Sequence, residues 1–437
     1  MFKRVLIANR GEIAVRIIRA CQEMGIETVA VYSDEDADAM HVRLADYSYN
    51  IGPADASESY LNIDALMEAA ERTEADAVHP GYGFLSEDAD FAEMVTKAGM
   101  TWIGPWADTI RKVGDKDEAR AAMIPSGIPM SKGSTPLTSV EDAVEQAKDV
   151  GYPIILKPVA GGGGKGMLIA NSEDDLRNIL TIIDINKVKY YFEHYIEHSR
   201  HIEVQIVADN YGHVIHLGER ECSLQRRNQK LLEESPSIAL TPDRRAEVGA
   251  LAIKAAKSVH YNNIGTVEFL LDLKTNQFNF MEINPRIQVE HGVTEAVTGI
   301  DLVRTQIRIA AGESLDLQQE DVKFTGHAIE CRINAEDPDN NFMPSPGKID
   351  FFLEPGGPRV RVDSGVCAGL SISPYYDSLI AKIVVRGRTR GDAIKIMRRA
   401  LNEFKVGGIK TTIPLHQRIL KNEYFCTGDI DTRFIRN

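Results

Sequence analysis

The chain has 437 residues, 43% of them apolar and 26% charged, which is enough hydrophobic material for about three folded domains and excludes a mainly disordered protein. Its 50 basic and 64 acidic side chains leave a net charge of −14, so binding to nucleic acid or to an anionic membrane surface is not expected. The five cysteines are far apart and form no Cys-x-x-Cys pair, which favours a reducing, cytoplasmic location. No apolar run approaches the ~18 residues of a membrane span.

The first hundred residues alternate short apolar runs with segments of helical periodicity. Apolar runs occupy residues 5–8 and 28–32, and the same pattern recurs at 75–78 and 101–104. This alternation predicts a parallel sheet flanked by helices. The first turn lacks Gly-x-Gly-x-x-Gly, so the sequence does not favour dinucleotide binding here.

A glycine run marks the next segment. A Pro/Gly/Ser-rich stretch near 126–136 forms a boundary, and a compact segment then leads to four consecutive glycines, 161–164, followed by Lys165. Glycines let backbone N–H groups approach an anion closely, and the lysine adds positive charge. The pattern is not a P-loop, because no Ser or Thr follows the lysine. We expect a small lid over a phosphate group, with a flexible hairpin tip as the alternative.

A hairpin built from 266–272 and 277–284 carries acidic residues. A turn midway between the two strands places Glu268 opposite Glu282, with Asn284 on the same face. The other face is expected to carry Val267, Phe269, Met281 and Ile283. Facing carboxylates destabilise a sheet unless a cation lies between them, and two carboxylates with an amide oxygen suit Mg²⁺. The alternative is a solvated hairpin face.

The residues after this hairpin extend the polar face if the strand continues. Arg286, Gln288 and Glu290 keep the parity of Asn284. A guanidinium, an amide and a carboxylate together can hold a small oxyanion and accept a proton. An Arg-Glu surface pair is the alternative.

Two further polar clusters precede the hairpin. His194, His198 and His201 have spacings of four and three, but no Cys or His-Glu-x-x-His accompanies them, so zinc is disfavoured. Residues 225–230 concentrate three cations in an acidic protein, which indicates either an anion clamp or a solvated turn.

Taken together, these residues resemble biotin carboxylase, the ATP-grasp component of acetyl-CoA carboxylase and of two-subunit pyruvate carboxylases. The resemblance covers essentially the whole chain and is carried by the glycine loop and by residues 6–14, 79–87, 225–227, 286–291, 330–338 and 374–377. It implies an α/β and α+β fold of the ATP-grasp type. A Rossmann-like domain would occupy 1–114, an ATP-grasp domain 115–324 with a lid at about 131–203, and a mixed α/β domain 325–437.

The resemblance also implies roles for individual residues. Nucleotide binding is assigned to Lys116, Lys157, Gly163, Gly164, Glu193, His194, Ile196, His201, Gln225 and Asn228. Mg²⁺ or Mn²⁺ is assigned to Glu268, Glu282 and Asn284. Bicarbonate is assigned to Arg286, Gln288 and the backbone of Val289. Lys230 would assist, Glu290 would be the general base, and Arg332 would stabilise the enolate of biotin.

The implied reaction is ATP- and bicarbonate-dependent carboxylation of biotin through carboxyphosphate, as the first half-reaction of acetyl-CoA carboxylase in fatty acid synthesis. No Ala-Met-Lys-Met motif is present, so biotin is expected on a separate biotin carboxyl carrier protein, with carboxyltransferase subunits as further partners. A homodimer is expected from residues that match the family's dimer contact, namely Arg16, Arg19, Glu23 and Arg361. The alternatives are a subunit of a pyruvate or other acyl-CoA carboxylase, a different ATP-grasp ligase, and a catalytically weak scaffold.

Several positions depart from the family pattern. Asn228 stands where many members have His, His194 replaces a Lys, Gly292 replaces a Pro, and Pro358 replaces an aromatic residue. The stretch from 167 to 193 is also several residues shorter than the family pattern.

Overall fold

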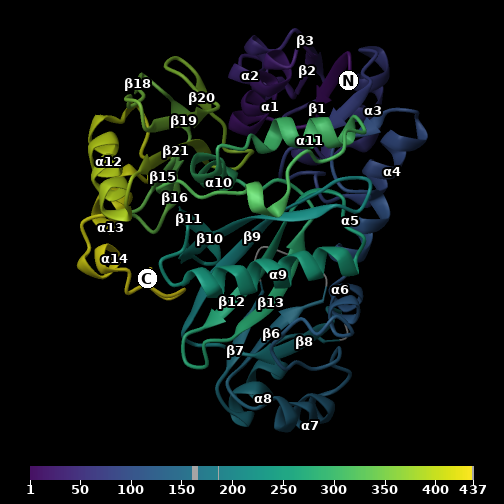
Figure 1. The fold of residues 1–437 in the computed structure, drawn as a ribbon, viewed down its shortest axis with the longest axis vertical. Coiled ribbons are helices and arrows are strands. Elements are labelled where there is room, and N and C mark those ends of the chain that lie inside the picture. The colour runs from purple at the N-terminus through teal and green to yellow at the C-terminus, as the bar shows by residue number, and fades with distance from the viewer. Residues whose placement is uncertain (160–165, 186, 436–437) are drawn as a thin grey trace.

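The computed structural model describes residues 1–159, 166–185 and 187–435. Figure 1 shows the N-terminal sheet at one end of the long axis, a large sheet across the middle and a small sheet with two helices at the other end. The C-terminal elements lie beside the large sheet. Among the described helices, none combines the length and the hydropathy needed to cross a bilayer.

The N-terminal sheet is parallel, as the alternating pattern predicts. Its strand order is β3-β2-β1-β4-β5. The strands are β1 (Arg4–Ile7), β2 (Glu27–Tyr32), β3 (Tyr47–Asn50), β4 (Ala77–His79) and β5 (Thr101–Trp102). The helices are α1 (Gly11–Glu23), α2 (Met40–Leu44), α3 (Ile63–Arg72), α4 (Ala89–Lys97) and α5 (Ala107–Gly114). Helix α1 forms because its apolar residues recur at helical spacing, and that face is buried.

The small sheet belongs to the segment predicted as a lid. Its antiparallel strands have the order β7-β6-β8. The elements of this region are α6 (Lys116–Met123), α7 (Val140–Val150), β6 (Ile154–Pro158), β7 (Leu168–Ala170), α8 (Glu173–Ile182) and β8 (Tyr190–His194). They enclose a core of their own, which includes Leu156, Leu176 and Phe192. The lid is therefore a separately packed unit.

The central sheet has eight antiparallel strands in the order β13-β12-β9-β10-β11-β14-β21-β19. They are β9 (Ser199–Ala208), β10 (Val214–Arg226), β11 (Gln229–Ser235), β12 (Asn263–Asp272), β13 (Phe278–Asn284), β14 (His327–Asn334), β19 (Val360–Ser364) and β21 (Leu379–Gly387). The associated helices are α9 (Pro242–Ser258), α10 (His291–Thr298) and α11 (Leu302–Ala310). Because β11 pairs with β14, one sheet runs across the predicted boundary at residue 325.

The remaining C-terminal elements are short strand pairs and three helices. The strands are β15 (Glu336–Asp337), β16 (Met343–Pro344), β17 (Gly347–Lys348), β18 (Phe351–Leu353), β20 (Ser371–Ile372) and β22 (Lys405–Gly407). The helices are α12 (Arg390–Glu403), α13 (Ile413–Ile419) and α14 (Glu423–Thr427). Helix α12 packs on the central sheet through Met397 and Leu401.

The acidic hairpin is formed by β12 and β13, and its predicted register is confirmed at the functional position. Glu268 pairs directly with Glu282. A bulge then shifts the register, so Phe269 faces Phe280 and the predicted inward position of Met281 is wrong. The rings of Phe278 and Phe280 each lie 6.2 Å from the ring of Phe269, so aromatic packing is satisfied only with the extra residue in β13.

Candidate active site

The lysine at residue 230 is the centre of a carboxylate cluster. Its Nζ lies 2.5 Å from Glu203, 3.0 Å from Glu268 and 2.7 Å from Glu290. These side chains come from β11, β9, β12 and the loop before α10. Burial alone would lower the pKa of Lys230, but the three carboxylates raise it well above its usual value. The cluster therefore holds a permanent positive charge among acids.

Glu290 connects this cluster to the C-terminal strands. It is fully buried, and its second oxygen lies 2.8 Å from Nη2 of Arg332 on β14. Burial would raise the pKa of Glu290, but Lys230 and Arg332 lower it well below its usual value. The carboxylate is thus ionised, as a proton acceptor must be.

Arg332 also contacts a second buried acid. Its Nε lies 2.6 Å from Oε1 of Glu233 on β11. Burial raises the pKa of Glu233 to about 7, although Arg332 opposes this shift. Arg332 itself stays charged, because Glu233 and Glu290 outweigh its burial and raise its pKa. Arg332 therefore lies between an ionised acid and one that titrates near neutral pH.

The predicted metal ligands meet at the neighbouring end of the sheet. Asn284 donates from Nδ2 to Glu268 Oε1 at 2.9 Å, and Glu282 faces Glu268 across the strand pair. Glu282 is open to solvent at its tip, yet surrounding protein raises its pKa, and the charges of Glu268 and Glu87 raise it further. The donors are hard oxygens with excess negative charge, so the residues present fit Mg²⁺.

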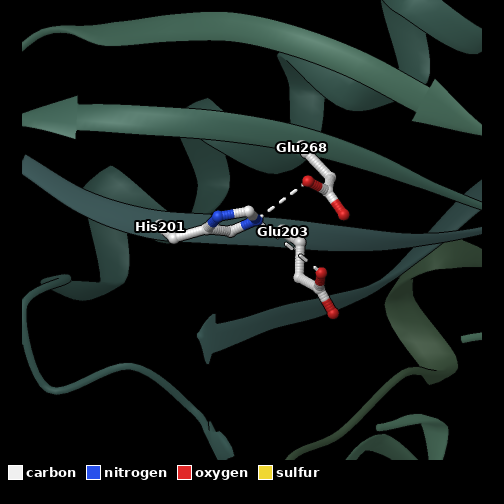
Figure 2. A group of neighbouring side chains, drawn as sticks. All are labelled: His201, Glu203 and Glu268. Carbon is white, nitrogen blue, oxygen red and sulfur yellow. Dashed lines mark ion pairs between the residues drawn. The ribbon is translucent and has the colours of Figure 1, made fainter. Parts of the chain in front are cut away.

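Figure 2 shows a second candidate metal group, His201, Glu203 and Glu268, on β9 and β12. His201 Nε2 lies 2.9 Å from Glu268 Oε2. The amide of Gln225 lies 3.0 Å from the other ring nitrogen, so Nδ1 accepts and Nε2 carries the proton. Since Lys230 already contacts both carboxylates, its amine supplies the cation here, and His201 orients Glu268.

The predicted oxyanion residues lie in a loop. Because β13 ends at Asn284, the expected continuation of strand parity through 286–290 is wrong. The loop nevertheless brings the side chains together: Arg286 Nη1 lies 2.8 Å from Gln288 Oε1, and Gln288 Nε2 lies 3.4 Å from Glu268. Arg286 Nε also pairs with Glu87 of the N-terminal region at 2.7 Å. Guanidinium and amide groups thus surround the approach to Glu290.

The predicted nucleotide residues of the lid form a second charged group. Glu193 on β8 lies 2.7 Å from Lys157 and 2.7 Å from Arg120. Lys116 donates to the carbonyl of Pro158 at 3.3 Å, and its pKa is lowered, mainly by burial. Gly163 and Gly164 lie outside the described residues.

The histidine segment is not a helix. His194 ends β8 and contacts the carbonyl of Gly151 at 3.1 Å, whereas His198 contacts Asp431. Ile196 lies half-buried in the connection to β9. The structure therefore separates the three histidines, which agrees with the sequence-based rejection of zinc.

Asn228 lies in the two-residue turn between β10 and β11. Arg227 and Asn228 both have positive φ, of 49° and 64°. Asn adopts this backbone conformation more readily than most residues, which accounts for its presence in this tight hairpin.

Sequence reasoning missed five charged residues around the site. These are Arg120, Glu203, Arg220, Glu233 and Lys382. Glu203 had a signal, since it alternates with apolar residues beside His201 in β9. The others resemble ordinary strand or helix residues, and only the tertiary structure brings them to the site.

Buried carboxylates, a magnesium-type ligand set and a cationic lid define an ATP-dependent enzyme of the ATP-grasp class. Residues 115–318 match the family "Carbamoyl-phosphate synthase L chain, ATP binding domain". Residues 1–110 match "Biotin carboxylase, N-terminal domain", and 330–437 match "Biotin carboxylase C-terminal domain". The chain therefore belongs to the biotin carboxylase family.

Similar proteins agree over the full length. Biotin carboxylase 1 of Bacillus subtilis is 54% identical over 100% of this chain and 98% of the relative. One subunit of the pyruvate carboxylase of Methanothermobacter thermautotrophicus is 48% identical over 100% and 90%. The biotin carboxylase domain dimer of Hydrogenobacter thermophilus 2-oxoglutarate carboxylase, solved with MgADP, ADP and bicarbonate, has a TM-score of 0.95 and 48% identity over 99% and 97%. That complex confirms nucleotide, magnesium and bicarbonate as ligands within the family.

Proposed function

We propose that this enzyme carboxylates biotin on a separate carrier protein with ATP and bicarbonate, through carboxyphosphate, as the first half-reaction of acetyl-CoA carboxylase. The observation that carries the proposal is the position of Glu290, ionised and held between Lys230 and Arg332. A base of this kind beside two fixed cations suits an anionic substrate that must lose a proton.

The first step follows from the charges around Glu290. Bicarbonate would bind at Arg286, Gln288 and the backbone of Val289, and would share Lys230 with Glu290. Because that cation is then shared, its hold on Glu290 weakens and the basicity of the carboxylate rises. Glu290 would take the proton, and the bicarbonate oxygen would attack the γ-phosphate of ATP to give carboxyphosphate and ADP.

The lid and the hairpin would hold the nucleotide. Lys116 and Lys157 would contact its phosphates, and Glu193, His194 and Ile196 would line the adenine side. Magnesium, held by Glu268, Glu282 and Asn284, would neutralise the charge that develops on the phosphates. Gly163 and Gly164 would cover them, and His201, Gln225 and Asn228 would complete the pocket.

The second step would use the other side of Glu290. Carboxyphosphate decomposes within the closed site, and the phosphate released can take the proton from biotin N1′. The guanidinium of Arg332, kept charged by Glu233 and Glu290, would stabilise the resulting enolate.

The proposal includes assembly and location. We expect the predicted domain division at 114 and 324, a homodimer, and association with a biotin carrier and carboxyltransferase subunits. Within one chain Arg16 pairs with Glu295 at 3.0 Å, while Arg19 is exposed and available to a second copy. All five cysteines are free, which supports a cytoplasmic location.

The test is ATP hydrolysis by the purified enzyme. We expect bicarbonate-dependent release of ADP that rises with free biotin, and a loss of at least about 10²-fold in Glu290→Gln. Glu247→Gln, an exposed change on α9, is the matched control. Hydrolysis indifferent to both bicarbonate and biotin would overturn the proposal.

The final acceptor needs a separate experiment, because the relatives serve different carboxylases. The carrier that co-purifies with the enzyme should be loaded with carboxybiotin and offered, with its carboxyltransferase, to acetyl-CoA, pyruvate and 2-oxoglutarate. Transfer to acetyl-CoA is expected, and transfer to either keto acid alone would replace that assignment.

A further inference from the structure

Lys382 on β21 is buried completely beside the oxyanion loop. Its Nζ lies 3.2 Å from Glu12 Oε1 on α1 and donates to the backbone carbonyl of Val289. One amine therefore joins the C-terminal strand, the N-terminal helix and the loop that carries Glu290. None of the roles assigned above involves this side chain.

The amine is charged in this position. Burial would lower the pKa of Lys382, but neighbouring carboxylates, Glu12 foremost, raise it above its usual value. The hydroxyl of Tyr82 donates to the same oxygen of Glu12. A charged donor makes a stronger hydrogen bond to a carbonyl than a neutral donor does.

Two consecutive peptide units of the loop are fixed by side chains. His291 Nδ1 lies 2.8 Å from the carbonyl of Gln288, which sets the direction of the Val289 N–H because the peptide unit is planar. Lys382 holds the next carbonyl, that of Val289, and so sets the plane from which Glu290 departs. The amine therefore acts on both the backbone donor and the carboxylate of the oxyanion site.

We propose that Lys382 is a positioning residue for the bicarbonate step. Its amine orients the Val289–Glu290 peptide and ties that peptide to Glu12 of the N-terminal region. The proposal rests on the function proposed above. Lys382 touches no substrate in this role; it acts through the loop.

The test compares three forms of the full-length enzyme. Lys382→Met alone leaves Glu12 buried without its cation and is expected to lower stability. The decisive variant is therefore Lys382→Met with Glu12→Gln, which removes both charges, and Glu12→Gln alone is the matched control that keeps the amine on Val289. We expect the KM for bicarbonate to rise about tenfold or more in the double variant and less than about threefold in the control, with the KM for ATP within about twofold in both.

A second measurement needs no substrate. Hydrogen exchange of the peptide spanning 286–292 should be at least about fivefold faster in the double variant than in Glu12→Gln. An unchanged bicarbonate KM, an equal rise in both KM values, or equal exchange would each overturn the positioning role. If the wild type lacked bicarbonate-dependent hydrolysis, the proposed function would fail, and the exchange data would still decide whether Lys382 orders the loop.

Discussion

The central sheet and the lid face the nucleotide site with opposite charge balances. On the sheet, Lys230 meets three carboxylates, and two arginines, Arg220 and Arg332, balance the rest. On the lid, three described cations surround one carboxylate, Glu193: these are Lys116, Arg120 and Lys157. The sheet is therefore charge-balanced without substrate, whereas the lid carries excess positive charge suited to a triphosphate. Preorganisation belongs to the sheet, and nucleotide capture belongs to the lid.

The sharpest way to break this comparison is Lys230→Met. The change leaves Glu203, Glu268 and Glu290 without their shared cation, so we expect a loss of about 3 kcal/mol or more in the free energy of unfolding. Bicarbonate-dependent hydrolysis should fall at least about 10²-fold. Urea unfolding and ADP release measure the two effects. Lys254→Met, an exposed change on α9, is the control; equal stability of the two variants would contradict a balanced sheet.

The next largest effect concerns pH. The pKa of Glu233 is about 7 in the folded chain, against 4.5 for an ordinary glutamate, so the folded state keeps a proton that the unfolded state releases. The stabilisation is fully present below pH 4.5 and is lost as the pH rises through 7. Glu233→Gln should remove this slope, on the order of 2 kcal/mol between pH 5.5 and 8.

The adjacent strand residue supplies the control for that measurement. Burial would raise the pKa of Glu234, but His327 and Arg390 lower it below its usual value. The contribution of Glu234 is therefore constant between pH 5.5 and 8, and Glu234→Gln should lower stability equally at both values. A wild-type slope that survives in Glu233→Gln would show that the proton is held elsewhere.

Local patterns predicted much of this molecule. Strand alternation predicted the parallel N-terminal sheet and the pairing of Glu268 with Glu282, because both depend on neighbouring residues in sequence. Family motifs predicted the fold class, which the structural relatives confirm. The roles of the individual site residues stay predictions, although the structure brings Lys230, Glu290 and Arg332 into contact.

What the sequence did not predict depends on distant pairing. Glu233 is buried because β11 pairs with β14 across a long connection, and nothing near residue 233 indicates this. The bulge in β13 depends on how its aromatic rings pack, which alternation does not encode. The glycine at 292 has a similar origin. A Cβ there would lie 2.9 Å from Glu330 Oε2 and from Val384 Cγ2, so the departure from the family's proline accommodates residues far along the chain.

The smallest effect on stability is expected on the lid, in Lys157→Met. This lysine pairs only with Glu193 among the described residues, and Glu193 keeps Arg120 as a second partner, so the free energy of unfolding should change by less than about 1 kcal/mol. The KM for ATP should rise about tenfold, because a charged contact to the triphosphate is lost, while the KM for bicarbonate stays within about twofold. Steady-state kinetics with each substrate varied, together with urea unfolding, measures all three quantities. A stability loss like that of Lys230→Met, or an equal rise in both KM values, would mean that the lid and the sheet form one electrostatic unit, and the division between capture and preorganisation would fail.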